Sequence, residues 1–219
     1  MVWPGTHTVV VPNPDLKPEK SLNYEAGSSF KADGVFGSDD HLFAKAVFFY
    51  DDVKDFIAPK AWFEPTTPPT VYYSSQNVGH VVRKGIELSG TYAAGQFSTS
   101  VSYGLLHAVD KETNERMNGI TPQSANLKLA YAFPAQAINV WYRAHWSKGG
   151  ESSVEDRATG KNLHFSSFLT HSLGAEWSPK VADLANLQAG IAVVNLFDKE
   201  YRMLNGSYGS GRGGRLWLS

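Results

Sequence analysis

Cysteine is absent from this chain of 219 residues. Its absence excludes disulfide bonds, thiolate metal sites and cysteine nucleophiles. Long apolar runs are missing too, because no stretch approaches the roughly 18 consecutive apolar residues that a membrane-spanning helix needs. If the chain crosses a membrane, we expect it to do so with strands.

An excess of charge is also missing. The formal net charge is −1, and the 20 Lys and Arg residues are spread along the chain. Proteins that bind nucleic acid usually carry a basic patch, so nucleic acid is excluded as a partner. The G-x-S-x-G, H-E-x-x-H and P-loop motifs do not occur, and we expect no enzyme activity. The first residues lack the regions of a secretory signal, so we expect a piece of a longer protein.

What the sequence does contain is a recurring alternation of apolar and polar residues. The alternation is clearest over residues 96–106, 124–133 and 137–146. A period of two predicts strands with one apolar and one polar face, whereas the helical period is weak wherever we test it. Weaker alternation predicts six further strands, at 21–31, 41–56, 71–92, 165–177, 187–195 and 212–219.

The connections between the nine predicted strands alternate between long and short. Long loops on one rim and tight turns on the other are typical of an all-β, antiparallel, up-and-down transmembrane barrel. The polar face carries charged side chains, among them Glu87, Lys128 and Arg143, which should face the lumen because lipid would penalise them. The long connections are 58–70, 109–122, 147–164 and 196–211, and the short ones are 32–40, 93–95, 134–136 and 178–186.

Four segments resemble motifs of the TonB-dependent outer-membrane receptors, and they follow the order found in that family. The third combines a glycine and an acidic residue in a strand, and in the fourth Asn195 and Asp198 can cap the turn that follows a strand. The segments are VPNPDLKPE (11–19) followed by NYEAG (23–27), FYDDVKDFI (49–57), NVG (77–79) with GIEL (85–88), and VNLFDKEYR (194–202).

The resemblance implies a barrel of about 22 strands in the outer membrane. A plug would close its lumen, and a TonB-type protein would supply energy. Residues 1–219 would form the nine C-terminal strands, without the plug domain. The implied function is uptake of an iron complex, with a ferric siderophore or haem as transported ligand rather than as a resident cofactor. A non-transporting outer-membrane barrel or pore and a soluble β-sandwich that binds carbohydrate remain as alternatives.

The resemblance also points to one candidate residue for binding haem. Haem iron accepts an axial imidazole, and in haem-type members of the family a histidine ligand lies in the loop before the NPxL segment. His7 lies in the corresponding loop and is therefore the candidate axial ligand. His107, His145 and His164 are weaker candidates, because they fall in or beside the long connections of the predicted extracellular rim.

A siderophore would instead be bound by arginine and aromatic side chains. Candidates of this kind on the predicted extracellular side are Trp62, Tyr72, Tyr73 and Arg157. One further histidine, His171, falls on the apolar face of its strand, and the barrel pattern does not explain it.

Overall fold

The computed structural model describes residues 7–64, 70–77, 79–155, 159–179, 187–204 and 206–218. All regular secondary structure in these ranges is β-strand. The ranges contain no helix that is long and apolar enough to cross a membrane. The chain divides into two compact units. The first comprises Met1–Tyr24, Tyr50–Arg83 and Ala108–Arg116, and the second comprises Glu25–Phe49, Lys84–His107 and Met117–Ser219.

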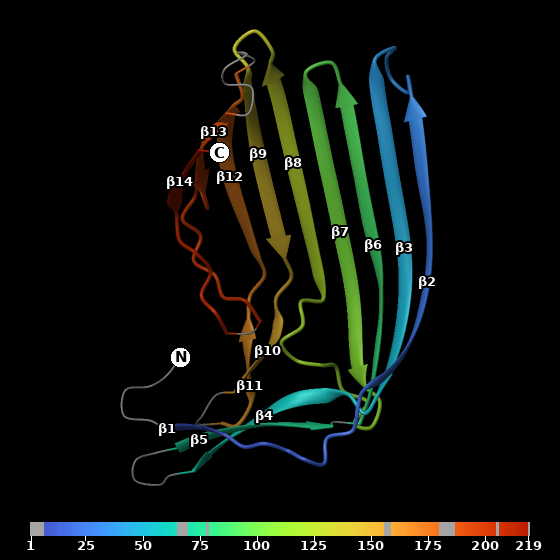
Figure 1. Ribbon diagram of the computed structural model, residues 1–219, viewed down its shortest axis with the longest axis vertical. Coiled ribbons are helices and arrows are strands. Elements are labelled where there is room, and N and C mark those ends of the chain that lie inside the picture. Colours follow the sequence, from blue (N-terminus) through green and yellow to red (C-terminus); the bar gives the residue numbers. More distant parts are fainter. Residues whose placement is uncertain are drawn as a thin grey trace. The chain divides into compact units, whose positions relative to one another are not determined.

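Nine strands form one sheet in the order β14-β13-β12-β9-β8-β7-β6-β3-β2 (Figure 1). The pairs from β7 to β14 with an assigned register are all antiparallel. The nine predicted strands and their up-and-down order are confirmed. Their bounds are β2 (Lys20–Asp33), β3 (Asp40–Lys54), β6 (His80–Ala94), β7 (Phe97–Asp110), β8 (Gln123–Phe133), β9 (Ile138–Ser147), β12 (Phe168–Trp177), β13 (Ala189–Val194) and β14 (Gly213–Leu218).

The long connections contain more structure than the sequence indicated. In the first unit, β1 (His7–Val10), β5 (Thr70–Asn77) and β4 (Ile57–Glu64) form a second sheet, in which β1 and β5 are parallel. In the second unit, β10 (Gly150–Glu155) and β11 (Asn162–Phe165) form an antiparallel pair. The prediction of irregular loops at these two places was therefore wrong.

The same comparison corrects one predicted strand. Residues 71–92 were expected to form a single strand but are divided between β5 and β6, and Gly79 between them has a φ of +58°. Prolines made the segment before β5 resemble a loop. The structure accommodates Pro59 because β4 lies at the edge of its three-stranded sheet, where proline is tolerated.

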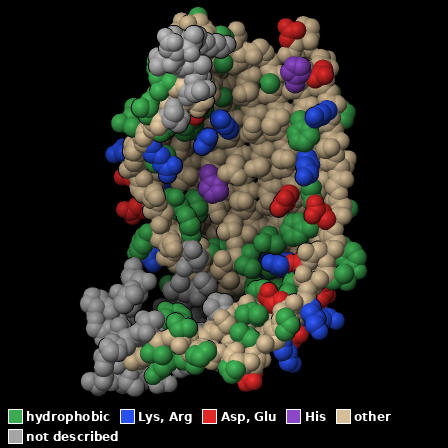
Figure 2. Space-filling model, in the orientation of Figure 1, with side chains coloured by type: hydrophobic (Ala, Val, Ile, Leu, Met, Phe, Trp, Pro, Cys, Tyr) green, Lys and Arg blue, Asp and Glu red, His purple; other side chains and the backbone are tan. Residues whose placement is uncertain are grey.

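The two faces of the large sheet differ in character. Leu129, Tyr142 and Leu173 are lateral neighbours on one face of β8, β9 and β12, whereas Lys128 and Arg143 are neighbours on the other. Figure 2 shows basic, acidic and histidine side chains dispersed over one face of the protein. The apolar face leaves large side chains exposed, as hydrocarbon contact requires. Examples are Val101, Tyr131, Ile191, Leu216 and Leu218.

Packing on the polar face depends on tryptophans that lie over glycines of the neighbouring strand. The ring of Trp141 occupies the space that a Cβ at Gly174 would need, and Trp217 does the same at Gly190. Trp141 also belongs to a buried cluster with Ala130 and Ala192, against which Trp217 packs. Glycine is required at these positions because each ring makes a close approach to the backbone.

Gly174→Ala tests this packing. The added methyl group would collide with the Trp141 ring, and we expect a loss of about 1–3 kcal/mol in the free energy of unfolding, as for other overpacked sites. Urea unfolding in lipid vesicles measures this quantity. The control is Gly104→Ala on β7, where the nearest atom to a new Cβ is Ser124 Oγ at 3.8 Å. Equal stability of the two variants would contradict the interpretation.

Candidate functional site

A hollow of about 690 Å³ lies in the second unit, between the segment that joins β11 to β12 and the segment that follows β13. Its lining combines aromatic rings with charged side chains of both signs. The aromatic and basic residues of the lining are His164, Phe165, Phe168, Lys199, Tyr201, Arg202 and Tyr208. We call this hollow the rim site, because it lies where β11 and β13 end and β12 begins.

Aromatic stacking and cation–π contacts organise the rim site. The rings of Phe168 and Tyr201 are stacked, with centroids 4.1 Å apart and planes inclined by 28°. The guanidinium carbon of Arg202 lies 3.9 Å from the ring centroid of Tyr208, and Arg202 donates a hydrogen bond to the Tyr208 hydroxyl. The site therefore presents the exposed Tyr208 ring beside a guanidinium group, a combination that suits an anionic ligand with a flat apolar part.

His164 contributes an exposed imidazole to the rim site. Its Nδ1 lies 3.0 Å from Glu151 Oε1, and 65% of its side chain is exposed. An interaction between the imidazole and a carboxylate fixes the ring orientation and leaves Nε2 accessible.

Asn195 holds together the segment that carries the tyrosines and Arg202. It is 5% exposed and has a φ of +48°. Its Nδ2 donates to the carbonyl oxygens of Lys199 at 2.9 Å and Ser210 at 3.0 Å, and its Oδ1 accepts from Lys199 N at 2.9 Å. Asp198 Oδ1 accepts from Arg212 N at 2.7 Å. The predicted capping role of Asn195 is confirmed, whereas the carboxylate of Asp198 bonds the backbone just before β14 rather than the turn after β13.

A second hollow, of about 590 Å³, lies on the polar face of the large sheet. Lys128 and Arg143 are direct neighbours across β8 and β9, and both line it. None of the described residues that line it is Asp or Glu. The Arg143 guanidinium lies 4.4 Å from the ring of Trp141, which holds it against the sheet. We call this hollow the wall site.

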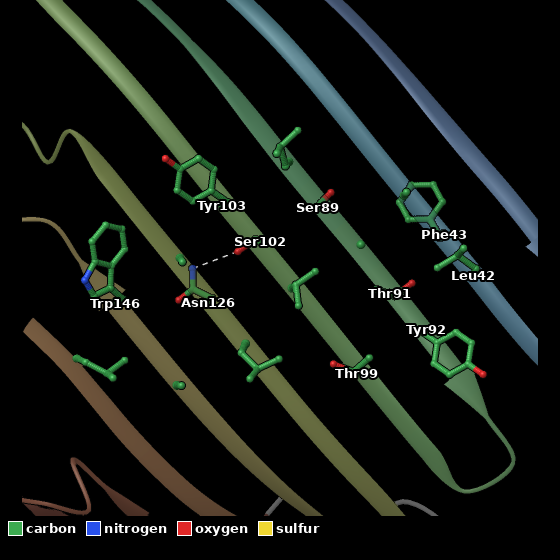
Figure 3. A pocket seen from close by; sticks show the side chains of 18 residues that line it. Leu42, Phe43, Ser89, Thr91, Tyr92, Thr99, Ser102, Tyr103, Asn126 and Trp146 are labelled. Carbon is green, nitrogen blue, oxygen red and sulfur yellow. Dashed lines mark hydrogen bonds between the residues drawn. The ribbon is translucent and has the colours of Figure 1, made fainter. Parts of the chain in front are cut away.

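Hydrogen bonds across three strands order the wall site. His145 Nδ1 donates to Asn126 Oδ1 at 2.7 Å, and Asn126 Nδ2 donates to Ser102 Oγ at 3.1 Å. The second of these bonds is drawn in Figure 3. Because an amide oxygen can only accept, His145 carries its proton on Nδ1, and Nε2 is the nitrogen available to a ligand.

Phe168 connects the two sites. Its ring is stacked on Tyr201 of the rim site, and its centroid lies 5.8 Å from that of His145 in the wall site. Aromatic, cationic and imidazole groups therefore follow one another along a continuous line on the polar face.

The structure brings two of the four candidate histidines into these sites, His164 and His145. His107 lies on β7 and lines neither site, and its place in the alternation puts it on the face of Tyr103. His7 begins β1, with its backbone opposite Thr70, so the expected loop is a strand. The side chain of His7 lies outside the described residues, and its role as ligand stays a prediction.

The candidate siderophore-binding residues lie elsewhere. Trp62 of β4 is opposite Tyr72 of β5, in the sheet of the first unit, and Tyr73 follows on the same strand. Arg157 is outside the described residues. Sequence reasoning missed the tyrosines and Arg202 of the rim site, although the VNLFDKEYR motif contains two of these residues, Tyr201 and Arg202.

His171 now has an explanation. It lies on the apolar face, where its Nδ1 is 2.5 Å from the Tyr142 hydroxyl. The ring of Phe197 covers it edge-on, with centroids 5.0 Å apart. The imidazole thus has a polar partner and an apolar cover, which reduces the penalty of placing it on this face.

With this geometry established, the chain can be compared with known proteins. A family model described as "TonB dependent receptor-like, beta-barrel" matches residues 3–196. The chain belongs to the TonB-dependent receptor family. Membership agrees with the antiparallel sheet and its exposed apolar face, and it places the protein in the outer membrane. It removes the alternative of a soluble carbohydrate-binding sandwich.

The chain is also similar to individual members of the TonB-dependent receptor family. The chain is 26% identical over 195 residues to "Heme/hemopexin utilization protein C" of Haemophilus influenzae, covering 88% of the chain and 27% of that protein. It is 28% identical over 203 residues to "Vitamin B12 transporter BtuB" of Photobacterium profundum, covering 92% and 29%. The FrpB iron transporter from Neisseria meningitidis has the same fold, with a TM-score of 0.68, 20% identity, and coverage of 96% and 31%. The chain thus spans less than a third of these relatives.

Asn195→Gly tests whether the hydrogen bonds of the Asn195 side chain, which we call the Asn195 clamp, position the rim site. Glycine accepts the positive φ, so the substitution removes only the side-chain hydrogen bonds. We expect unfolding to become easier by about 1–3 kcal/mol, because the partner groups lose their bonds. Limited proteolysis should cut faster between residues 196 and 211. As a control, Asn139→Gly on β9 changes an asparagine outside the clamp, and equal cleavage in both variants would refute the clamp.

Proposed function

We propose that this protein is part of an outer-membrane receptor, not an enzyme, that takes up an iron complex with energy from a TonB-type protein. The observation that carries the proposal is the rim site, where stacked rings adjoin Arg202 and the imidazole of His164. The wall site supports it, because its cations continue the same line along the polar face. Family membership supports transport as the general activity.

Haem is the ligand that the rim site suits best. A porphyrin is planar and can pack against the exposed Tyr208 ring, while its carboxylates can pair with Arg202 and Lys199. Haem iron would accept an imidazole or a phenolate. We propose His7 as one axial ligand, as the family resemblance implies, and His164 as the candidate within the rim site. The similarity to a haem/hemopexin utilization protein supports this assignment.

A ferric siderophore is the second candidate ligand. Tyr208 is exposed and lies beside Arg202, and an aromatic ring with a guanidinium also suits an anionic iron chelate. A pore that transports no iron complex remains the third possibility. The three differ in what they bind, so a binding experiment separates them.

Arg202→Ala should weaken hemin binding by about tenfold or more, because a charge-assisted hydrogen bond contributes roughly 1.5–3 kcal/mol. The protein in detergent is titrated with hemin while the Soret band is followed. Arg116→Ala is the matched control, since Arg116 belongs to the first unit and does not line the rim site. Equal affinity in both variants would remove Arg202 from the ligand site.

The same titration separates the ligands. A Soret shift that disappears in His7→Ala or in His164→Ala assigns that histidine to the iron. If hemin causes no shift and a ferric catecholate quenches tryptophan fluorescence, the ligand is a siderophore. Binding of neither complex would favour the pore.

Lys128→Gln and Arg143→Gln test the wall site. Each removes a positive charge but keeps a polar side chain, so uptake of a labelled anionic iron complex should slow several-fold while affinity at the rim site stays unchanged. The stability of Lys128→Gln should hold or rise, because like charges on opposite residues of a sheet repel. Arg143→Gln also loses the contact with Trp141, which offsets that gain. The control is Lys148→Gln, an exposed lysine just after β9. Unchanged uptake would exclude the wall site from the path.

A further inference from the structure

One hollow of the second unit lies on the apolar face, behind the wall site, with which it shares lining residues such as Gly90 and Ala144. Its volume is about 740 Å³, and its lining contains no charged residue. It extends over β3, β6, β7, β8, β9 and β12. Figure 3 shows it with Tyr103 and Trp146 toward one end and Tyr92 at the other. We call it the lipid-side groove.

Small residues form the floor of the groove. Ala125 lies between Tyr103 and Trp146 in the lateral register of β7, β8 and β9, so two large rings flank a methyl group. The other small residues with the same orientation are Ala44, Gly90 and Ala144. A row of small side chains between large ones leaves a recess in a surface that hydrocarbon must fill.

The groove crosses the strands of the sheet and covers only a few residues of each. Tyr92 lies two residues from the end of β6 at the short turn to β7, and Trp146 lies one residue from the opposite end of β9. Tyrosine and tryptophan favour the two membrane interfaces, and the apolar lining between them is suited to hydrocarbon.

We propose that the lipid-side groove is a specific binding site for an acyl chain of a membrane phospholipid. The groove is continuous with the apolar face that contacts the membrane, so lipid is the molecule that reaches it first. A flexible acyl chain can follow the recess and supply the van der Waals contacts that its walls would otherwise lack. Lipopolysaccharide carries several phosphates that require a cluster of cations, and no Lys or Arg lines the groove.

Gly90→Leu fills the groove and tests the proposal. A Cβ at residue 90 would lie 3.4 Å from Phe43 O and 3.5 Å from Val101 Cγ2, so the sheet accommodates a side chain there. Gly214→Leu is the matched control, because Gly214 lies on the same face of β14 with no atom within 4 Å of a new Cβ. Each protein is purified from membranes in mild detergent and its retained lipids are counted by native mass spectrometry.

We expect wild type and Gly214→Leu to retain one phospholipid, and Gly90→Leu to lose at least nine-tenths of it. Retention by Gly90→Leu equal to wild type, or no retained phospholipid in wild type, would overturn the proposal. A retained lipopolysaccharide would overturn the choice of lipid. Far-UV circular dichroism checks folding, and if Gly90→Leu fails to fold, Ala144→Leu fills the same floor from β9. Hemin binding at the rim site should stay unchanged, because neither Gly90 nor Ala144 lines that site.

Discussion

Backbone hydrogen bonding in hydrocarbon is the constraint on which the other features of this protein depend. A strand in lipid has no water to bond its N–H and C=O groups, so a neighbouring strand must bond them residue by residue. The registers of β8 with β9 and of β9 with β12 run without interruption, from Ser124–Ser147 to Phe133–Ile138 and from Phe168–Ser147 to Trp177–Ile138. An uninterrupted register forces successive side chains to opposite faces, and the two chemistries of the sheet follow from it.

The uninterrupted register places two positive charges next to each other on the polar face, an arrangement that is unfavourable by itself. Lys128 and Arg143 are opposite each other, and cross-strand pairs of this kind change stability by about 0.2–1 kcal/mol. The contact between Arg143 and Trp141 contributes about 0.5–2 kcal/mol in the opposite direction. The cation–π contact is therefore large enough to offset the repulsion. The Trp141 ring can lie in that place because residue 174 is glycine.

The sequence alone predicted the features that depend on alternation. It identified nine strands, their order and their two faces, because the period of two is read directly from the chain. It did not predict that β4 and β5 pair. A proline such as Pro59 is more common in loops than in strands, and the sequence does not reveal that β4 is an edge strand, where proline is tolerated. It also could not place Lys128 beside Arg143, because that requires the register between strands, which tertiary pairing fixes. The rim site depends on the hydrogen bonds of Asn195 to residues up to 15 positions away.

The alternation of apolar and polar residues does not specify how large the side chains on the apolar face are. Ala125 and Tyr103 satisfy the same apolar pattern, yet one forms the floor of a groove and the other its wall. In a water-soluble sheet a partner layer would fill such a recess, because an unfilled space forfeits van der Waals contacts. In a membrane the solvent itself is a set of flexible chains, so the recess is filled without a protein partner. The ligand that we propose for the polar face would be selected by charge and by its contacts with aromatic rings, whereas the lipid that we propose for the apolar face would be selected by shape alone.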